Sequence, residues 1–146
     1  MAAKVLALTR YPEKGGPGEN LSEMSFVGGA GVEGDCYQGG GERQVSLLTA
    51  EARKWVAAQV EPGLCFGRFR ENVLIEGAWP EGMASGGTII LGDDVVLRVA
   101  EAGKRCFSQC GLFAGGKHCL LKECAVFAAV AQGGAVKIGD KIQVQV

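Results

Sequence analysis

Apolar and polar residues alternate along several short segments of the chain, which is the pattern of strands with one buried face. The alternation is clearest at the carboxyl end, where polar residues separate Ile142, Val144 and Val146. Further strands bounded by glycine or aspartate turns are predicted at residues 2–8, 43–49, 71–77, 88–93 and 94–103. Short strands at such close spacing indicate a mainly β protein, with a closed or nearly closed β-barrel as the leading architecture.

Two segments depart from this pattern and predict one longer and one short helix. The longer helix covers residues 50–60, with Thr49 as its amino-terminal cap and Pro62 just beyond its end. The short helix covers residues 122–134 and ends near Gly133. Residues 11–23 are polar and contain two prolines, so we expect an exposed loop there. No repeat or linker divides the chain, so residues 1–146 are predicted to form a single domain.

Glycine accounts for 24 of the 146 residues, without the three-residue period of collagen. Most of these glycines are interpreted as turns between short strands. The exception is the glycine-rich segment, residues 28–41, whose backbone can approach a ligand closely. It lacks the lysine and the following helix of a P-loop, so its amides are expected to suit at most a single anionic phosphate.

The charge of the chain limits its partners. The formal net charge is -1, which provides no basic field to hold a nucleic-acid backbone. The apolar run before Arg10 is too short for a signal peptide, and no run reaches the roughly 18 apolar residues of a membrane-spanning helix. We therefore expect a cytoplasmic protein that binds neither nucleic acid nor membranes.

Cysteine is the strongest chemical signal in the sequence. The six cysteines are Cys36, Cys65, Cys106, Cys110, Cys119 and Cys124. In a reducing cytosol they are expected to serve as thiols, metal ligands or catalytic groups rather than as disulfides. Four of them lie within residues 106–124, so the chemistry is predicted there. Cys65 and Cys36 are interpreted mainly as structural, although Cys36 lies in the glycine-rich segment and could face the same pocket.

Three stretches, in this order, resemble the MOSC domain, the carboxyl-terminal module of molybdenum-cofactor sulfurases, in its small stand-alone bacterial form. They are GVEGDCYQGGGERQVSLLTAE at residues 31–51, FGRFRENVLIEG at residues 66–77, and residues 103–142, which begin GKRCFSQCG. The resemblance implies a β-barrel of the MOSC or pyruvate-kinase-barrel-like type. Tyr37 stands where the family usually has histidine, so the proton transfer or ligation of an imidazole is absent at that position.

The same resemblance implies molybdenum-cofactor or sulfur chemistry. It predicts a protein that binds a molybdopterin-type cofactor, carries sulfane sulfur on a cysteine, or does both. As an enzyme it would be a sulfur transferase or a component of a molybdenum-cofactor-dependent reductase, with cofactor-synthesis enzymes or molybdoenzymes as partners. The family also has an association with pyridoxal phosphate. Two alternatives stay open, a non-enzymatic adaptor that binds the cofactor for a synthesis enzyme and a structural metal-thiolate domain.

Cys106 is the predicted working thiol. Lys104 and Arg105 precede it, and adjacent cations stabilise a thiolate, which is the form that attacks sulfur or binds metal. The resemblance also aligns Cys106 with the family's cysteine that carries persulfide or ligates molybdenum. The alternative is a buried, inert thiol, because free cysteine is among the most buried residue types.

Cys110 and Cys119 are the predicted partners of that thiol. Either could convert a persulfide or sulfenate on Cys106 into a disulfide. The alternative is a metal site formed by the three thiols together with His118 or Cys124. No C-x2-C pair occurs in this region, which argues against ordinary zinc.

Polar residues in the first two stretches are candidates for holding the cofactor. Asp35 could bond a pterin ring or orient a base, and Arg43 could pair with a phosphate. The full predicted cofactor-binding set is Asp35, Tyr37, Arg43, Arg70, Asn72, Lys104 and Arg105. The alternatives are that Asp35 satisfies backbone donors in a Gly-Asp turn and that Arg70 and Asn72 belong to a solvated, charged strand edge.

Overall fold

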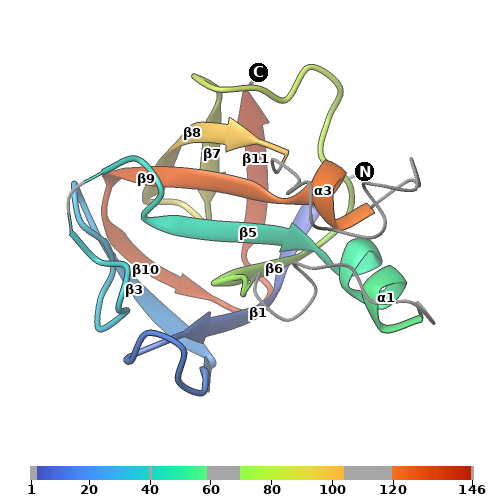
Figure 1. Cartoon of the computed structure of the whole chain (residues 1–146). Coiled ribbons are helices and arrows are strands. Elements are labelled where there is room, and N and C mark those ends of the chain that lie inside the picture. The colour runs from blue at the N-terminus through green and yellow to red at the C-terminus, as the bar shows by residue number, and fades with distance from the viewer. Residues whose placement is uncertain (1–2, 40, 59–69, 104–119, 146) are drawn as a thin grey trace.

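The computed structural model describes residues 3–39, 41–58, 70–103 and 120–145 of the chain (Figure 1). The helices are α1 (Ala50–Ala58) and α3 (Leu120–Cys124). The strands are β1 (Ala3–Arg10), β2 (Glu19–Leu21), β3 (Glu23–Val27), β4 (Gly31–Val32), β5 (Val45–Thr49), β6 (Val73–Glu76), β7 (Thr88–Leu91), β8 (Val95–Ala102), β9 (Val126–Gln132), β10 (Gly134–Lys137) and β11 (Lys141–Gln145).

Seven of these strands close into a barrel. Their order is β11-β7-β8-β9-β5-β6-β1, and a further pairing of β11 with β1 completes the ring. All neighbours in the ring are antiparallel except β5 and β6, which run parallel. Helix α1 follows β5 in the crossover between these two strands. The predicted mainly β architecture with a closed barrel is therefore confirmed.

The barrel interior is filled by alternate side chains of each strand. In β9, Val126, Ala128 and Val130 are buried, and the intervening residues are more exposed. The other ring strands contribute in the same way, so that one continuous apolar cluster occupies the barrel. This alternation with a period of two residues is what a closed sheet with a packed lumen requires.

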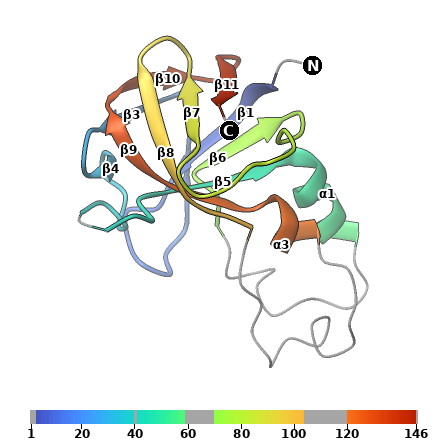
Figure 2. The ribbon, with the colours of Figure 1, turned by 90° about the horizontal axis from the view of Figure 1, so that it is seen from above.

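A second, smaller apolar cluster lies outside the barrel, beneath the two helices. Leu47 of β5 belongs to the barrel cluster, whereas its neighbour Leu48 packs against Ala52 of α1 and Leu121 of α3. Successive strand residues point to opposite faces, so β5 supplies both clusters. Figures 1 and 2 show α1 and α3 side by side at one end of the barrel.

A short three-stranded sheet, in the order β10-β3-β4, lies beside the barrel. The chain passes from barrel strand β9 into β10 at Gly133 and Gly134. A Cβ at Gly133 would collide with the carbonyl oxygen of Phe26 on β3, so only glycine fits this corner.

Two sequence predictions are wrong in detail. Residues 122–134 were expected to form a helix, but helix α3 ends at Cys124 and Val126–Gln132 is a barrel strand. Pairing with β5 and β8 on either side outweighs the local preference of this segment. Residues 11–23 were expected to be a loop, but Glu19–Leu21 forms β2 and Glu23 begins β3.

Candidate functional site

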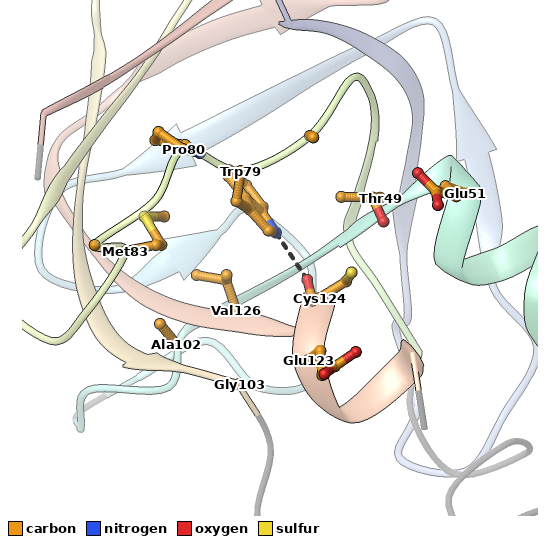
Figure 3. A pocket seen from close by; sticks show the side chains of 12 residues that line it. Thr49, Glu51, Trp79, Pro80, Met83, Ala102, Gly103, Glu123, Cys124 and Val126 are labelled. Carbon is orange, nitrogen blue, oxygen red and sulfur yellow. Dashed lines mark hydrogen bonds between the residues drawn. The ribbon is translucent and has the colours of Figure 1, made fainter. Parts of the chain in front are cut away.

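A cavity of about 330 Å³ opens next to the two helices (Figure 3). We call it the thiol cavity, since Cys124 is in its wall. The end of β5, the start of α1, the residues that follow β6, the end of β8 and the end of α3 form the rest of the wall. Its volume is at the lower end of the range for small-molecule sites.

Trp79 and Cys124 are in direct contact in the wall of this cavity. The indole Nε1–H of Trp79 donates a hydrogen bond of 2.8 Å to the carbonyl oxygen of Cys124 (Figure 3). The ring also packs against the barrel cluster, so the bond and the packing together fix its orientation. Met83 and Val126 add apolar surface. One wall of the cavity is therefore a rigid aromatic and aliphatic surface.

Cys124 is a half-buried free thiol. Burial raises its pKa, and the nearby Glu123 and Glu51 carboxylates raise it further, while a hydrogen bond with Thr49 lowers it. A raised pKa leaves the thiol protonated and less nucleophilic at neutral pH. The sequence left open whether Cys124 is a redox partner, a metal ligand or a structural residue, and no pattern in it placed Cys124 next to Thr49 and Glu51.

Both carboxylates near Cys124 line the cavity. Glu51 lies in the first turn of α1, where it meets the positive end of the helix dipole. Glu123 lies in α3. No lysine or arginine occurs among the described residues of the wall. The described wall is therefore acidic on one side and apolar on the other.

The segment between β8 and α3, residues 104–119, holds the predicted thiols Cys106, Cys110 and Cys119, together with Lys104 and Arg105. It lies outside the described residues, as do Cys65 and His118. Its flanks are described. Gly103 lines the cavity, and its N–H donates a 2.7 Å hydrogen bond to the carbonyl oxygen of Ala125, just beyond α3. The two described flanks of this cysteine segment are thus bonded to each other beside the thiol cavity.

Asp35 and Asn72, two of the predicted cofactor-binding residues, are in direct contact. The Asn72 Nδ2 amide donates to Asp35 Oδ1 at 3.2 Å, and the backbone N–H of Tyr11 donates to the same oxygen at 2.8 Å. The other carboxylate oxygen of Asp35 accepts the N–H of Tyr37 at 3.2 Å. Asp35 is only 5% exposed. This carboxylate therefore ties the glycine-rich segment to β1 and β6.

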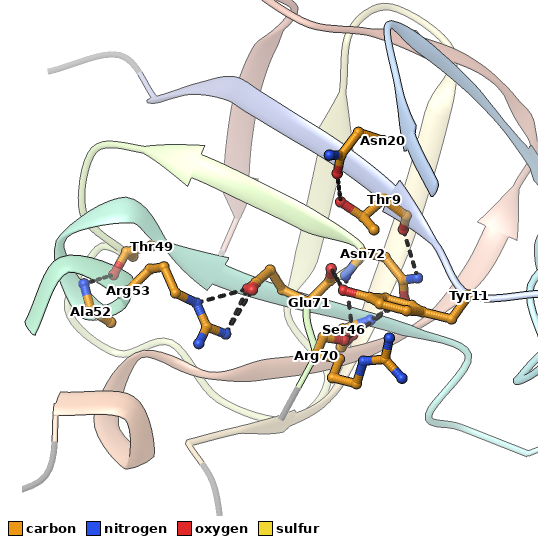
Figure 4. Close-up of polar contacts among 10 residues, drawn as sticks. All are labelled: Thr9, Tyr11, Asn20, Ser46, Thr49, Ala52, Arg53, Arg70, Glu71 and Asn72. Atoms are coloured by element: carbon orange, nitrogen blue, oxygen red, sulfur yellow. Dashed lines mark hydrogen bonds and ion pairs between the residues drawn. The ribbon is translucent and has the colours of Figure 1, made fainter. Parts of the chain in front are cut away.

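Asn72 also bonds to Ser46 of β5, and Figure 4 shows these two side chains together. Its Oδ1 accepts hydrogen bonds from the backbone N–H and the hydroxyl of Ser46, and its Nδ2 also donates to the carbonyl oxygen of Thr9. Asn72 is 2% exposed. We call Asp35, Asn72, Ser46 and Tyr11 the Asp35–Asn72 cluster. Its polar atoms hold together the starts of the parallel strands β5 and β6.

Arg70 lies beside this cluster. Its guanidinium packs 4.1 Å from the centre of the Tyr11 ring and donates to the carbonyl oxygen of Gly16. The Tyr11 hydroxyl donates to the carbonyl oxygen of Glu71 at 3.0 Å. Burial is the main reason why the pKa of Tyr11 is raised, and the Glu71 carboxylate adds to it. Arg53 of α1 pairs with the Glu71 carboxylate at 2.6 Å, which links the helix to the start of β6.

Arg43 and Tyr37 are placed apart from these contacts. Arg43 forms an ion pair with Glu101 of β8 and packs 4.6 Å from the centre of the Phe127 ring. The Tyr37 side chain is exposed at the surface, and only its backbone contacts Asp35. None of Asp35, Tyr37, Arg43, Arg70 and Asn72 lines the thiol cavity.

Gln44 organises the glycine-rich segment, a role that sequence reasoning missed. Its buried Nε2 amide donates to the carbonyl oxygens of Gly29, Gly39 and Gly41, and its Oε1 accepts the N–H of Val130. The three glycines belong to the glycine-rich segment that precedes Gln44 in the sequence. Val130 is in β9, and only the folded barrel brings it next to Gln44.

The amides of the glycine-rich segment are largely engaged inside the protein. Donors to backbone carbonyls include the N–H groups of Gly29, Ala30, Glu33, Asp35, Cys36, Gln38 and Gly39. The N–H groups of Gly34 and Tyr37 donate to side chains. These amides are therefore not directed at a phosphate in this structure.

A molybdopterin-type cofactor carries an anionic phosphate, which calls for cations or backbone donors. The described wall of the thiol cavity offers two carboxylates and no base, and the amides above have internal acceptors. The described residues therefore do not fit such a group, and we derive no chemical step through it. Within the same residues, no three His, Cys, Asp or Glu side chains lie close enough to hold a metal ion.

No helix in the described part of the chain is long enough and apolar enough to cross a bilayer. Comparisons with known proteins give one family. A sequence model of the MOSC domain matches residues 34–143, which is most of the chain. No curated protein sequence matches at a significant level.

Solved structures give the same fold at low identity. The YuaD protein from Bacillus subtilis has a TM-score of 0.71 at 21% identity, with 99% of this chain and 96% of that chain covered. YiiM from Escherichia coli has a TM-score of 0.61 at 14% identity, with 100% and 70% covered. YiiM from Geobacillus stearothermophilus has a TM-score of 0.58 at 14% identity, with 99% and 75% covered. At these identities the likeness concerns the fold.

Proposed function

The chain belongs to the MOSC domain family, and from this premise we propose that it is a sulfur-handling protein in which Cys106 carries sulfane sulfur beside the thiol cavity. MOSC domains are associated with molybdenum-cofactor-related proteins, and sulfur delivery in that context needs a thiol and a small-molecule site rather than a phosphate cradle. The chain carries its thiols in the cysteine segment, and the cavity supplies the space.

One observation supports this proposal above the others. Gly103, the residue that precedes the cysteine segment, lines the cavity and is bonded to Ala125 at the segment's other flank. Cys106 is only three residues from Gly103 in the sequence, and this short spacing supports a working thiol near the cavity. Cys119 directly precedes α3, whose end forms part of the wall.

The chemistry needs no outside oxidant. The Cys106 thiolate attacks the outer sulfur of an organic persulfide, the donor's S–S bond breaks, and the donor leaves as a thiolate. A new S–S bond forms on Cys106, which becomes a persulfide. Discharge is the reverse reaction: an acceptor thiolate attacks the outer sulfur, the S–S bond on Cys106 breaks, and Cys106 leaves as a thiolate. Lys104 and Arg105 favour the attacking thiolate form of Cys106.

Cyanide tests the proposal, because it removes sulfane sulfur from a persulfide as thiocyanate. Protein incubated with an organic persulfide and freed of excess donor is expected to yield close to one thiocyanate per chain. Cys106→Ser should yield almost none, whereas Cys36→Ser, which removes a described thiol outside the cavity wall, should yield as much as the unmodified chain. Equal yields from Cys106→Ser and the unmodified chain would contradict the proposal.

A further inference from the structure

Three separate parts of the chain form an apolar surface in the thiol cavity. Trp79 and Met83 come from the connection between β6 and β7, Ala102 ends β8, and Val126 begins β9 (Figure 3). Ala102 and Val126 are paired across the two strands. Val126 belongs to the apolar cluster of the barrel, and the other three residues pack against that cluster. The core of the barrel therefore continues outward as the apolar surface of the cavity.

The Trp79 ring is already prepared to be covered by an apolar molecule. The only polar atom of a tryptophan side chain is its indole nitrogen, and in Trp79 the N–H on this atom is bonded to the carbonyl oxygen of Cys124 at 2.8 Å. A molecule that covers the ring therefore leaves no polar atom of this side chain unpaired. The ring is also held in place before the molecule arrives, which reduces the entropy that binding costs.

The apolar surface adjoins the start of the cysteine segment. Gly103 follows Ala102 directly and lines the same cavity. Its N–H is bonded to the carbonyl oxygen of Ala125, the residue before Val126. The segment that carries Cys106 begins at the next residue of the chain. A molecule whose organic body covers this surface therefore lies beside the point where the cysteine segment leaves β8.

The size of the cavity limits what this body can be. A volume of about 330 Å³ suits one small organic molecule rather than a peptide segment. Moving alkyl groups out of water onto an apolar surface is favourable, and the gain grows with the area that is covered. Binding in this cavity should therefore strengthen as the aliphatic part of a small molecule becomes longer.

From this arrangement we propose that the thiol cavity binds the aliphatic body of an organosulfur compound, so that alkyl persulfides with several carbon atoms are better donors than methyl persulfide. The inference rests on the proposed sulfur-handling function and names the class of its donor. Trp79 and Met83 are the residues that determine this specificity, because they supply the largest apolar side chains of the described wall.

The first measurement uses ligands without sulfur, so that it does not depend on the proposed function. The chain has two tryptophans, and Trp55→Phe leaves Trp79 as the only one. Its fluorescence then reports binding in the cavity wall during titration with linear alcohols from 1-propanol to 1-hexanol. We expect the affinity to rise about two- to fourfold for each added methylene group.

Two variants in the Trp55→Phe chain locate this binding. Met83→Ser removes apolar surface from the cavity and should reduce the gain in affinity for each methylene group. Leu6→Ser is the matched control, because Leu6 is 43% exposed on β1 and lies outside the cavity wall, and it should leave the gain unchanged.

The second measurement extends the series to sulfur transfer in the unmodified chain. Methyl, propyl and pentyl persulfides are compared as donors, and the sulfur gained by Cys106 is followed in the tryptic peptide of residues 106–117. Dividing each rate by the rate of the same donor with 2-mercaptoethanol removes the intrinsic reactivity of the donor. The corrected rates should rise along the series in the same order as the affinities of the alcohols.

The proposal is overturned if the alcohols leave Trp79 fluorescence unchanged or bind with an affinity that is independent of chain length. It is also overturned if Met83→Ser keeps the full gain, or if the corrected transfer rates do not increase from methyl to pentyl persulfide. Failure of the proposed function is a separate observation. Alcohols that bind with the expected gain, together with no sulfur on Cys106 from any donor, would support an aliphatic ligand site and refute the sulfur carrier.

Discussion

Two polar regions lie at opposite ends of the parallel strands β5 and β6, and they use similar residues differently. At the strand starts, the Asp35–Asn72 cluster pairs its polar atoms with backbone groups of β1, β5 and the glycine-rich segment. At the strand ends, Glu51 and Cys124 line a cavity. Asp35 is buried, whereas Glu51 is exposed to that cavity.

The difference separates structural from chemical roles among residues of the same type. A buried carboxylate or amide with all its hydrogen bonds made inside the protein stabilises the fold, and leaving such a group unpaired is costly. A thiol and carboxylates that face a cavity are available to a ligand. Removing polar groups at the strand starts should therefore damage stability, and removing them at the strand ends should change reactivity.

The largest effect is expected for Asn72→Ala. The change removes the Asn72 side-chain partner of the Ser46 N–H and of the Thr9 carbonyl, and it removes one of the hydrogen bonds to Asp35. Each buried orphan costs about 1–3 kcal/mol, so we expect a loss of roughly 3–5 kcal/mol in the free energy of unfolding, measured by urea denaturation. Asn20→Ala is the matched control, because Asn20 bonds Thr9 at the exposed surface and should cost about 0.5 kcal/mol or less. Equal losses in the two variants would remove the distinction between the regions.

A smaller effect is expected for Thr49→Ala, since Thr49 belongs to both the fold and the cavity. Its hydroxyl accepts the N–H of Ala52 at 3.2 Å as the cap of α1, and loss of a cap costs about 1 kcal/mol. Its hydrogen bond also lowers the pKa of Cys124. In the variant, Cys124 should therefore react more slowly with a thiol-modifying reagent at neutral pH. Thr49→Ser keeps the hydroxyl, so its free energy of unfolding and its reaction rate at Cys124 should match those of the unmodified chain. If Thr49→Ala loses stability but Cys124 reacts at an unchanged rate, Thr49 stabilises the helix and has no effect on the thiol.

The smallest effect concerns alkaline pH. Burial raises the pKa of Cys124 above its ordinary value of 9.0, so the folded chain holds this proton more tightly than the unfolded chain does. The resulting stability is fully present below the unfolded pKa and is lost as pH rises through the folded pKa.

Urea denaturation between about pH 8 and 10, a range that brackets the ordinary thiol pKa, should show a shallower alkaline decline for Cys124→Ser than for the unmodified chain. Cys36 and Tyr11 also have raised pKa values, so they contribute to the alkaline loss of stability in both proteins. Only the difference between the two curves belongs to Cys124, and parallel curves would contradict the assignment.

The sequence predicts the barrel well where strand patterns are local. The alternation of Ile142 and Val144, the β-rich segments at β7 and β8, and the Thr49 cap before α1 all correspond to observed elements. These features depend on neighbouring residues and on the burial of one face of a strand. Both are visible in the alternation of apolar and polar residues along the sequence.

The strand β9 shows where local information fails. Residues 126–132 carry three alanines, which favour a helix. Their place between β5 and β8 overrides that preference. The signal that could have identified the strand is the alternation of Val126, Ala128 and Val130, all of which are buried.

The candidate site was only partly predictable because its contacts are distant in sequence. Asp35 and Asn72 were both selected as candidates, but their hydrogen bond crosses 37 positions and requires the closed barrel. The role of Cys124 stayed open between redox partner, metal ligand and structural residue, because nothing in its own neighbourhood in the sequence predicts Thr49 and Glu51 beside it. The roles predicted for Cys106, Cys110 and Cys119 stay predictions.

The most direct test of Cys106 as the sulfur carrier is to map where donor sulfur resides in the unmodified chain. After exposure to a small neutral persulfide, trypsin separates Cys106 and Cys110, in residues 106–117, from Cys119 and from Cys124, in residues 123–137. We expect one added sulfur atom on Cys106, located by peptide fragmentation, and none on Cys124, whose raised pKa keeps it protonated. Sulfur found on Cys124 with none on Cys106, or on neither thiol, would contradict the central claim.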